Sequence, residues 1–209
     1  LLDNVTISGA QGLGFSFYAI NPLSDNLKVT DSDKVGRLWS FSAMTNMPNG
    51  RYTGNNDDRI EFQPNDATGE LRIRNVGVPY HQTRSTLRTS ASNGLMVIEP
   101  GVNYQVCDGC RVEFGWAGGL GHALTAVGTA QEPIVFGSAN PNPTQGIWDG
   151  VWLLTGLVDG ATVDYWQISD GGVRGRGALN AVTGGPTTIS NSSFSNSAGF
   201  GMYIAPSST

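Results

Sequence analysis

The chain has 209 residues, of which 12 are Lys or Arg and 17 are Asp or Glu, so its net charge is -5. This length suits one domain or two small ones. The acidic balance offers no basic face for phosphates, so nucleic acid is not an expected partner. No apolar run approaches the roughly 18 residues of a membrane-spanning helix, so no membrane span is expected. The 29 glycines, with many Ser, Thr and Asn residues, disfavour helices and favour short strands joined by turns.

In chain order, residues 1–20 are predicted to form a first β coil. The region 21–75 is less regular, and we interpret it as an irregular β insertion or subdomain with short strands at 27–30, 35–41, 60–62 and 71–74. Residues 76–209 are expected to form regular coils, because strand-length apolar segments alternate there with Gly-rich and Pro-rich turn clusters. These segments are 95–98, 111–114, 123–127, 134–136, 151–154, 161–166, 178–182 and 188–189.

An internal repeat relates the two ends of the chain. Residues 4–15 align without gaps with residues 191–202, an offset of 191 minus 4, or 187, and their apolar positions correspond. Residues 1–20 are therefore expected to form a coil equivalent to 188–205. Asn4 and Asn191 each begin an N-glycosylation sequon, but a stacked turn asparagine is the favoured interpretation of both.

Short, evenly spaced strands without a helix pattern are typical of a β-solenoid or a β-sandwich. Sandwich strands should be linked by hairpin turns, yet the Asn-Gly pairs are only Asn49-Gly50 and Asn93-Gly94. In a solenoid each strand stacks on its equivalent in the next coil, with apolar residues inward and Asn, Ser or Thr at the turns. Residues 191–197 fit that description, so an all-β solenoid is predicted.

Several motifs in the second half of the chain resemble those of a known family. They are Glu99-Pro100-Gly101 after 95–98, Val112-Glu113-Phe114-Gly115, Glu132-Pro133 before 134–136, Trp148-Asp149-Gly150-Val151-Trp152, Val163-Asp164-Tyr165-Trp166 and the segment 188–194. This set resembles the right-handed parallel β-helix repeat proteins of bacterial secreted and surface polypeptides, which are similar in fold to the pectate-lyase-like superfamily. The resemblance covers roughly 58–204. It implies a right-handed parallel β-helix and an extracellular or cell-surface location, but it leaves the activity open because fold does not specify function.

The two cysteines, Cys107 and Cys110, lie three residues apart. The favoured interpretations are a local disulfide or two reduced thiols. A redox dithiol would need a helix N-terminus after a strand, whereas strand-like residues flank this pair. A zinc site would need two more ligands, and the spacing of His81 and His122 does not supply them. No metal is therefore predicted here.

An enzyme of this fold would need acidic and basic residues in a defined arrangement. A uronate lyase needs an Arg or Lys near the abstracted proton and usually acidic ligands for Ca²⁺, whereas a hydrolase needs paired carboxylates. The candidate catalytic residues are Asp149, Asp164, Asp170, Arg174 and Arg176. Asp164 and Asp170 would share a face of an unbroken strand, but the following glycine turn removes that guarantee. A cofactor is not expected unless the chain is a lyase that uses Ca²⁺.

The run Asp57-Asp58-Arg59 is a further acidic candidate. The preceding turn Gly54-Asn55-Asn56 favours a capped, solvated loop instead, because short polar side chains there bind their own backbone.

Three tryptophans could stack on sugar rings. Trp148 and Trp152 are four residues apart, which places them on the same side of one strand, with Trp166 one coil away. An exposed row of indoles would bind carbohydrate. The apolar neighbours Ile147, Val151 and Leu153 make a core position the favoured interpretation.

Two classes of function follow. The first is a non-catalytic extracellular β-helix module that is structural, adhesive or self-assembling; its partner would be copies of itself, through head-to-tail contacts of the coil ends, or polysaccharide. The second is a polysaccharide lyase or glycoside hydrolase acting on acidic polysaccharide. The low charge, 14% Asp, Glu, Lys and Arg, favours the first class.

Overall fold

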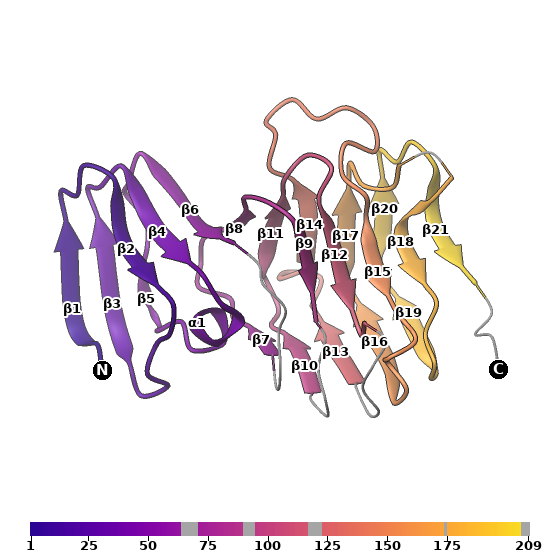
Figure 1. Cartoon of the computed structure of the whole chain (residues 1–209), viewed down its shortest axis with the longest axis horizontal. Helices are drawn as coiled ribbons and strands as arrows, with labels where there is room; N and C mark the ends of the chain where they lie inside the picture. Colours follow the sequence, from indigo (N-terminus) through magenta and orange to yellow (C-terminus); the bar gives the residue numbers. More distant parts are fainter. Residues whose placement is uncertain (64–70, 90–94, 117–122, 174, 206–209) are drawn as a thin grey trace.

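The computed structural model of the chain describes residues 1–63, 71–89, 95–116, 123–173 and 175–205. Within these residues the chain is all-β, apart from one helix of a little over one turn, and its strands form four parallel sheets (Figure 1). The three-stranded sheet comprises β1 (Asp3–Ser8), β3 (Asp25–Thr30) and β5 (Gly50–Arg51). The eight-stranded sheet comprises β2 (Leu13–Phe17), β4 (Lys34–Leu38), β6 (Asp57–Phe62), β8 (Tyr80–Gln82), β11 (Asn103–Val106), β14 (Ile134–Ser138), β17 (Trp166–Ser169) and β20 (Ser193–Ser195).

Two five-stranded sheets complete the described fold. One comprises β7 (Leu71–Ile73), β10 (Leu95–Ile98), β13 (Ala123–Val127), β16 (Gly160–Asp164) and β19 (Thr187–Ser190). The other comprises β9 (Thr86–Arg88), β12 (Arg111–Phe114), β15 (Val151–Leu153), β18 (Gly177–Ala181) and β21 (Phe200–Ile204). In the described part of the chain no helix is long and apolar enough to cross a membrane.

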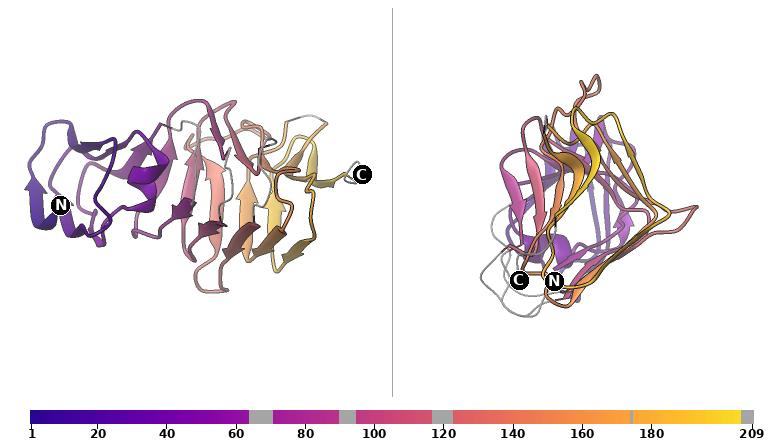
Figure 2. Two further views of the ribbon diagram at one scale, coloured as in Figure 1. Left: turned by 60° about the horizontal axis from the view of Figure 1, so that its bottom comes forward. Right: turned by 90° about the vertical axis from the view of Figure 1, so that its right-hand side faces the viewer.

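Strands that follow one another along the chain lie in different sheets. β10, β11 and β12 are consecutive, and each pairs in parallel with the strand three places later, β13, β14 and β15 respectively. The same step relates β13–β15 to β16–β18 and β16–β18 to β19–β21. The strands thus stack as successive coils around one interior, as the end-on view in Figure 2 shows. This confirms the predicted all-β, all-parallel architecture and is compatible with a parallel β-helix.

Residues 21–75 contribute strands to the same stack. β3 pairs with β1, β4 pairs with β2, and β6 pairs with both β4 and β8. The first three coils (β1–β2, β3–β4 and β5–β6) contain two strands each, whereas the coils from β7 onward contain three. Through β4 and β6 this region is continuous with the later coils in the eight-stranded sheet, whereas β1, β3 and β5 form a sheet of their own.

The helix α1 (Phe41–Thr45) follows β4 and was not predicted. The expected strand 35–41 ends early because the Ser40 hydroxyl accepts a hydrogen bond from the Ala43 amide at 3.1 Å and caps the helix. Phe41 and Met44 are buried against the interior. The Thr45 hydroxyl accepts a hydrogen bond from the Arg72 amide at 3.1 Å, which ties the helix to β7.

Asparagine and aspartate side chains connect the turns of successive coils. Asn26 donates to the Asn4 amide oxygen at 2.6 Å, and Asn56 donates to the Asp33 carboxylate at 3.0 Å. Asn4 and Asn26 also share a positive φ, which asparagine tolerates better than most residues. Asn4 therefore stacks on Asn26 of the neighbouring coil, although both residues lie at the starts of β1 and β3 and not in the turns.

The alignment of residues 4–15 with residues 191–202 does not pair strands that occupy the same sheet. It pairs β1 with β20, but β20 lies in the eight-stranded sheet with β2. Gly9, at the turn after the first strand of its coil, corresponds by position to Asn191, after β19, and both have positive φ. The misalignment has a physical cause. Every turn within a coil is flanked by two strands, so the sequence pattern around one turn resembles the pattern around the next.

Aromatic side chains fill the interior in a column along the coils. Tyr80, Tyr104 and Phe136 occupy equivalent positions on β8, β11 and β14, and their ring centroids are 6.5 and 5.7 Å apart. All three side chains are at most 1% exposed. Such burial supplies the main stabilising free energy of the stack.

Candidate functional site

Trp148 and Trp166 occupy core positions, which was the favoured interpretation, so these two candidates cannot stack on carbohydrate. Trp148 and Trp166 are both 0% exposed, and each indole N–H donates to a backbone carbonyl, that of Ser169 and that of Ala126, at 2.9 Å. Trp166 packs against Phe114 and Phe136, and Trp148 pairs with Gly171 of the next coil. A sugar ring has no access to either indole.

Trp152 lies on the outer side of β15, within a group of charged residues. We name Arg88, Arg111, Glu113, Asp149 and Arg176 the charged cluster. These residues come from β9, from β12 and from the segments just before β15 and β18, so the cluster crosses four successive coils. Alternation along β12 places Arg111 and Glu113 on its outer side, since their neighbours Val112 and Phe114 are buried in the core.

Guanidinium groups occupy all four carboxylate oxygens of the charged cluster. Glu113 accepts from Arg88 at 2.8 Å and from Arg111 at 2.8 Å, one on each oxygen. Asp149 accepts from Arg176 at 3.0 and 2.8 Å, and Arg111 also donates to it. The Glu113 side chain is only 2% exposed, so this pairing offsets the cost of burying its charge.

The electrostatics of Arg111 follow from these contacts. Burial lowers the pKa of Arg111, but hydrogen bonds to Glu113 and Asp149 and their charges outweigh burial, and the net pKa is raised. The Trp152 ring lies between two arginines, with its centroid 5.0 Å from the Arg111 guanidinium carbon and 5.3 Å from that of Arg176. These contacts are cation–π interactions. The charged cluster thus links coils by ion pairs and stacking.

The other two candidate acids lie at different corners of one coil. Asp164 ends β16 and Asp170 follows β17, and the chain turns at Tyr165, whose φ is +52°. They therefore do not share a strand face. Each accepts a hydrogen bond from the asparagine of the next coil, Asp164 from Asn191 at 2.8 Å and Asp170 from Asn196 at 2.6 Å.

Hydrogen bonds from Asn191 and Ser190 lower the pKa of Asp164. A carboxyl with a lowered pKa stays ionised at neutral pH and is a poor general acid. The hydrogen bond that Asp164 accepts from Asn191 of the next coil explains why an aspartate occupies this position.

The acidic run near residue 57 has a structural role as well. Arg59 binds the Asp57 carboxylate through two N–H groups, each at 2.8 Å. Asp58 accepts hydrogen bonds from the backbone amides of Gly54 and Asn55, which is the turn-capping role predicted for this run.

Arg174 lies outside the described residues. Cys107 and Cys110 form a disulfide across the short turn between β11 and β12, with their Cα atoms 5.3 Å apart. Among the described residues, no three His, Cys, Asp or Glu side chains form a group that could hold a metal ion.

Sequence reasoning missed the arginines that organise the site, Arg88 and Arg111, together with Glu113. The alternation of polar and apolar residues in 111–114 was a usable signal, because it places residues 111 and 113 on the outer face. It also missed a stacked aromatic pair, the exposed Tyr18 and the half-buried Trp39, whose ring centroids are 5.3 Å apart.

A second ion-pair group lies on the eight-stranded sheet. Glu61 is 5% exposed and accepts hydrogen bonds from Lys34 at 2.6 Å and from Arg37 at 2.8 Å. Burial raises the pKa of Glu61, but these hydrogen bonds and charges outweigh it and the net pKa is lowered. The neighbouring His81 has a lowered pKa because burial disfavours its charged form.

These shifts predict that the protein loses stability in acid. A lowered folded-state pKa means that the unfolded chain binds protons first, so stability falls as pH drops below about 6.5 for His81 and below about 4.3 for Glu61. Chemical unfolding between pH 7 and pH 3 should show a declining free energy of unfolding. Glu61→Gln should flatten the decline below pH 5, whereas Glu132→Gln, at an exposed position, should leave the profile unchanged. A profile identical in wild type and Glu61→Gln would contradict the role of this group.

Comparisons with protein-family models, with curated proteins and with solved structures found no match. The class of protein therefore follows from the described residues alone. The chain is an all-β protein of stacked parallel sheets, with ion pairs and amide ladders that join its coils on the outside.

Proposed function

We propose that the chain is a non-catalytic, right-handed parallel β-helix module of an extracellular or cell-surface protein, with a structural, adhesive or self-assembling role. One observation carries this proposal. Each candidate catalytic acid bonds to a neighbouring coil: Asp149 through Arg111 and Arg176, Asp164 through Asn191, and Asp170 through Asn196. A carboxylate oxygen that is engaged between coils is less available to a substrate, which favours a structural role for these acids.

General considerations support the finer parts of the proposal. Parallel strands joined by crossovers are right-handed in about 98% of cases, because the strand twist favours that hand. The Cys107–Cys110 disulfide is of a kind that persists in oxidising compartments outside the cytosol. The resemblance to secreted and surface β-helix repeat polypeptides points to the same setting.

Exposed edges support a self-assembling role. Among the described residues β21 is an edge strand, and Phe200, Met202 and Ile204 on it are 53, 42 and 63% exposed. Unpaired backbone groups beside exposed apolar side chains form a surface on which further strands can pair. Light scattering with negative-stain imaging should then reveal concentration-dependent association, and Met202→Lys should reduce it.

The non-catalytic role has a direct test. Purified protein should release no unsaturated or reducing-end product from polygalacturonate, with or without Ca²⁺, while a known polysaccharide lyase assayed in parallel does. Asp149→Asn and Asp164→Asn should give the same blank result. Product release that is lost in either variant would overturn the proposal in favour of a lyase or hydrolase.

A further inference from the structure

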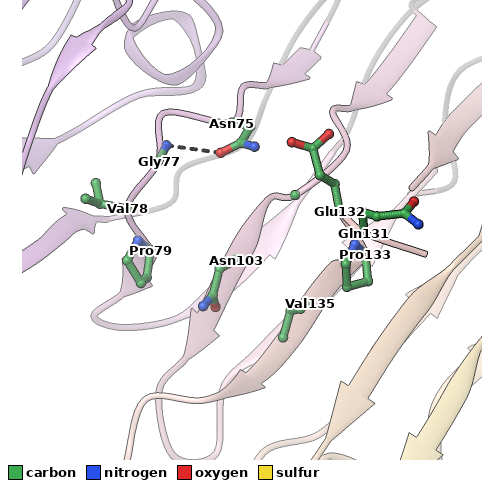
Figure 3. A pocket seen from close by; sticks show the side chains of 10 residues that line it. Asn75, Gly77, Val78, Pro79, Asn103, Gln131, Glu132, Pro133 and Val135 are labelled. Carbon is green, nitrogen blue, oxygen red and sulfur yellow. Dashed lines mark hydrogen bonds between the residues drawn. The ribbon is translucent and has the colours of Figure 1, made fainter. Parts of the chain in front are cut away.

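A shallow groove lies on the outside of the stack, where three successive coils turn into the eight-stranded sheet (Figure 3). Its volume is about 440 Å³. It is separate from the charged cluster, which lies along the sheet of β9, β12, β15 and β18. Its lining combines neutral polar, apolar and glycine residues with one carboxylate: Asn75, Gly77, Val78, Pro79, Gly101, Asn103, Gln131, Glu132, Pro133 and Val135.

The rim of the groove is held in place by bonds between coils. The Asn75 amide nitrogen donates to the Pro100 carbonyl at 3.0 Å, and its oxygen accepts from the Gly77 amide at 3.0 Å. Gly101 donates its N–H to the Glu132 carbonyl at 3.0 Å. The groove is therefore formed before any ligand arrives, which reduces the entropy lost on binding.

The floor of the groove alternates between polar and apolar side chains. Asn103 on β11 lies directly beside Val135 on β14, and Pro79 precedes β8 on the other side. Neighbouring strands are about 4.8 Å apart, so these side chains form a continuous strip across the coils. The side chains of Asn103, Gln131 and Glu132 line the groove, and those of Gln131 and Glu132 are exposed, so they can reach a ligand.

The charge of the groove lining indicates which class of ligand the groove can bind. No Lys or Arg lines the groove, and Glu132 contributes a negative charge, so a uronate or other polyanion would be repelled. An extended peptide would need a free strand edge, whereas β11 and β14 are paired on both sides. Hydroxyl groups of a neutral sugar can donate to Glu132 and to the amide oxygens, while its C–H face contacts Pro133 and Val135.

We propose that this groove binds a neutral hexose or pentose oligosaccharide, with Asn103 and Glu132 as hydrogen-bonding residues and Val135 as the apolar contact. The inference rests on the proposed adhesive function and specifies its ligand class. The acidic polysaccharide expected as the substrate of a lyase or hydrolase would be repelled from this groove.

Calorimetric titration of the purified chain tests the assignment. The probes are tetrasaccharides of glucose, mannose, galactose and xylose, with tetragalacturonate and a serine-rich octapeptide for comparison. At least one neutral tetrasaccharide should bind, and tetragalacturonate and the peptide should not. Asn103→Ala should weaken binding by about five- to tenfold, the effect of one or two hydrogen bonds. Val135→Asp should abolish it, and Thr125→Ala, an exposed change on another sheet, should leave it unchanged.

Each contrary result is distinct. No binding of any neutral probe at millimolar concentration, tighter binding of tetragalacturonate or of the peptide, or binding insensitive to both groove variants would each overturn the assignment. Circular dichroism of the variants establishes that they are folded. A failure here leaves the product-release assay unaffected, so loss of the groove assignment and loss of the non-catalytic proposal can be told apart.

Discussion

Replacing Trp166 with alanine is expected to lower the free energy of unfolding by about 3–5 kcal/mol, the range for removing a large buried aromatic side chain. The Trp166 side chain is 0% exposed, and its ring centroid lies 5.1 Å from that of Phe136 and 6.5 Å from that of Phe114. Its indole N–H also donates to the Ala126 carbonyl at 2.9 Å, so the substitution leaves both a cavity and a carbonyl without its partner.

Trp116→Ala is the matched control for this prediction. Trp116 is 41% exposed and stacks only with the Arg88 guanidinium among the described aromatic and cation–π contacts, so its loss should cost under about 1 kcal/mol. Urea unfolding followed by circular dichroism measures both variants without depending on tryptophan fluorescence. A Trp166→Ala protein as stable as Trp116→Ala would show that the interior is not packed as described.

Replacing Gly150 with alanine is expected to destabilise the fold strongly, by about 3 kcal/mol or more, since backbone strain and steric overlap add. Gly150 has φ of +101°, a conformation that side chains disfavour. An added Cβ would lie 2.6 Å from the Gly177 carbonyl oxygen and 2.8 Å from that of Ala178, on the next coil. Because these obstacles are backbone atoms of a paired strand, they cannot move without separating β15 from β18.

Gly9→Ala separates the two contributions. Gly9 also has positive φ, +71°, but no atom lies within 4 Å of its added Cβ. Its substitution should cost only the conformational part, about 1–2 kcal/mol. Thermal and urea unfolding of the two variants should therefore differ clearly. Equal losses would mean that the coils at Gly150 are not in close backbone contact.

Strand identity could be predicted where apolar and polar residues alternate. The predicted segments 95–98 and 111–114 coincide with β10 and β12, and 27–30 lies within β3. The segment 161–166 was predicted as one strand, but the turn at Tyr165 divides it between β16 and β17. The positive φ of Tyr165 is imposed by the stacked coils. Tyrosine rarely adopts this conformation, so its presence in the sequence does not indicate a turn.

Short polar strands escaped prediction for a related reason. β8 and β9 each have three residues, and β8 contains His81 and Gln82, so neither shows a periodic apolar pattern. Both exist because the adjacent coils offer a ladder of backbone partners. Pairing, more than intrinsic preference, stabilises such strands.

The candidate site was visible only in part. Asp149, Arg176 and Trp152 were recognised as residues with chemical potential, and they do lie together. Their partners could not be named, because Arg111 and Asp149 are 38 residues apart whereas Arg88 and Glu113 are 25 apart. Because the number of residues per coil varies, a constant spacing in the sequence does not reveal which residues of neighbouring coils are in contact.

Composition and patterning by themselves determined that this protein is built of short parallel-stacking strands, with asparagine and aspartate at its turns and apolar residues inside. Those features depend on local preferences and on the two-residue periodicity of a strand. Only the tertiary structure decided which tryptophans are core, which carboxylates are neutralised by arginine, and where an outer groove forms. These outcomes depend on the register between coils, and a shift of one residue would exchange the inner and outer faces of a strand.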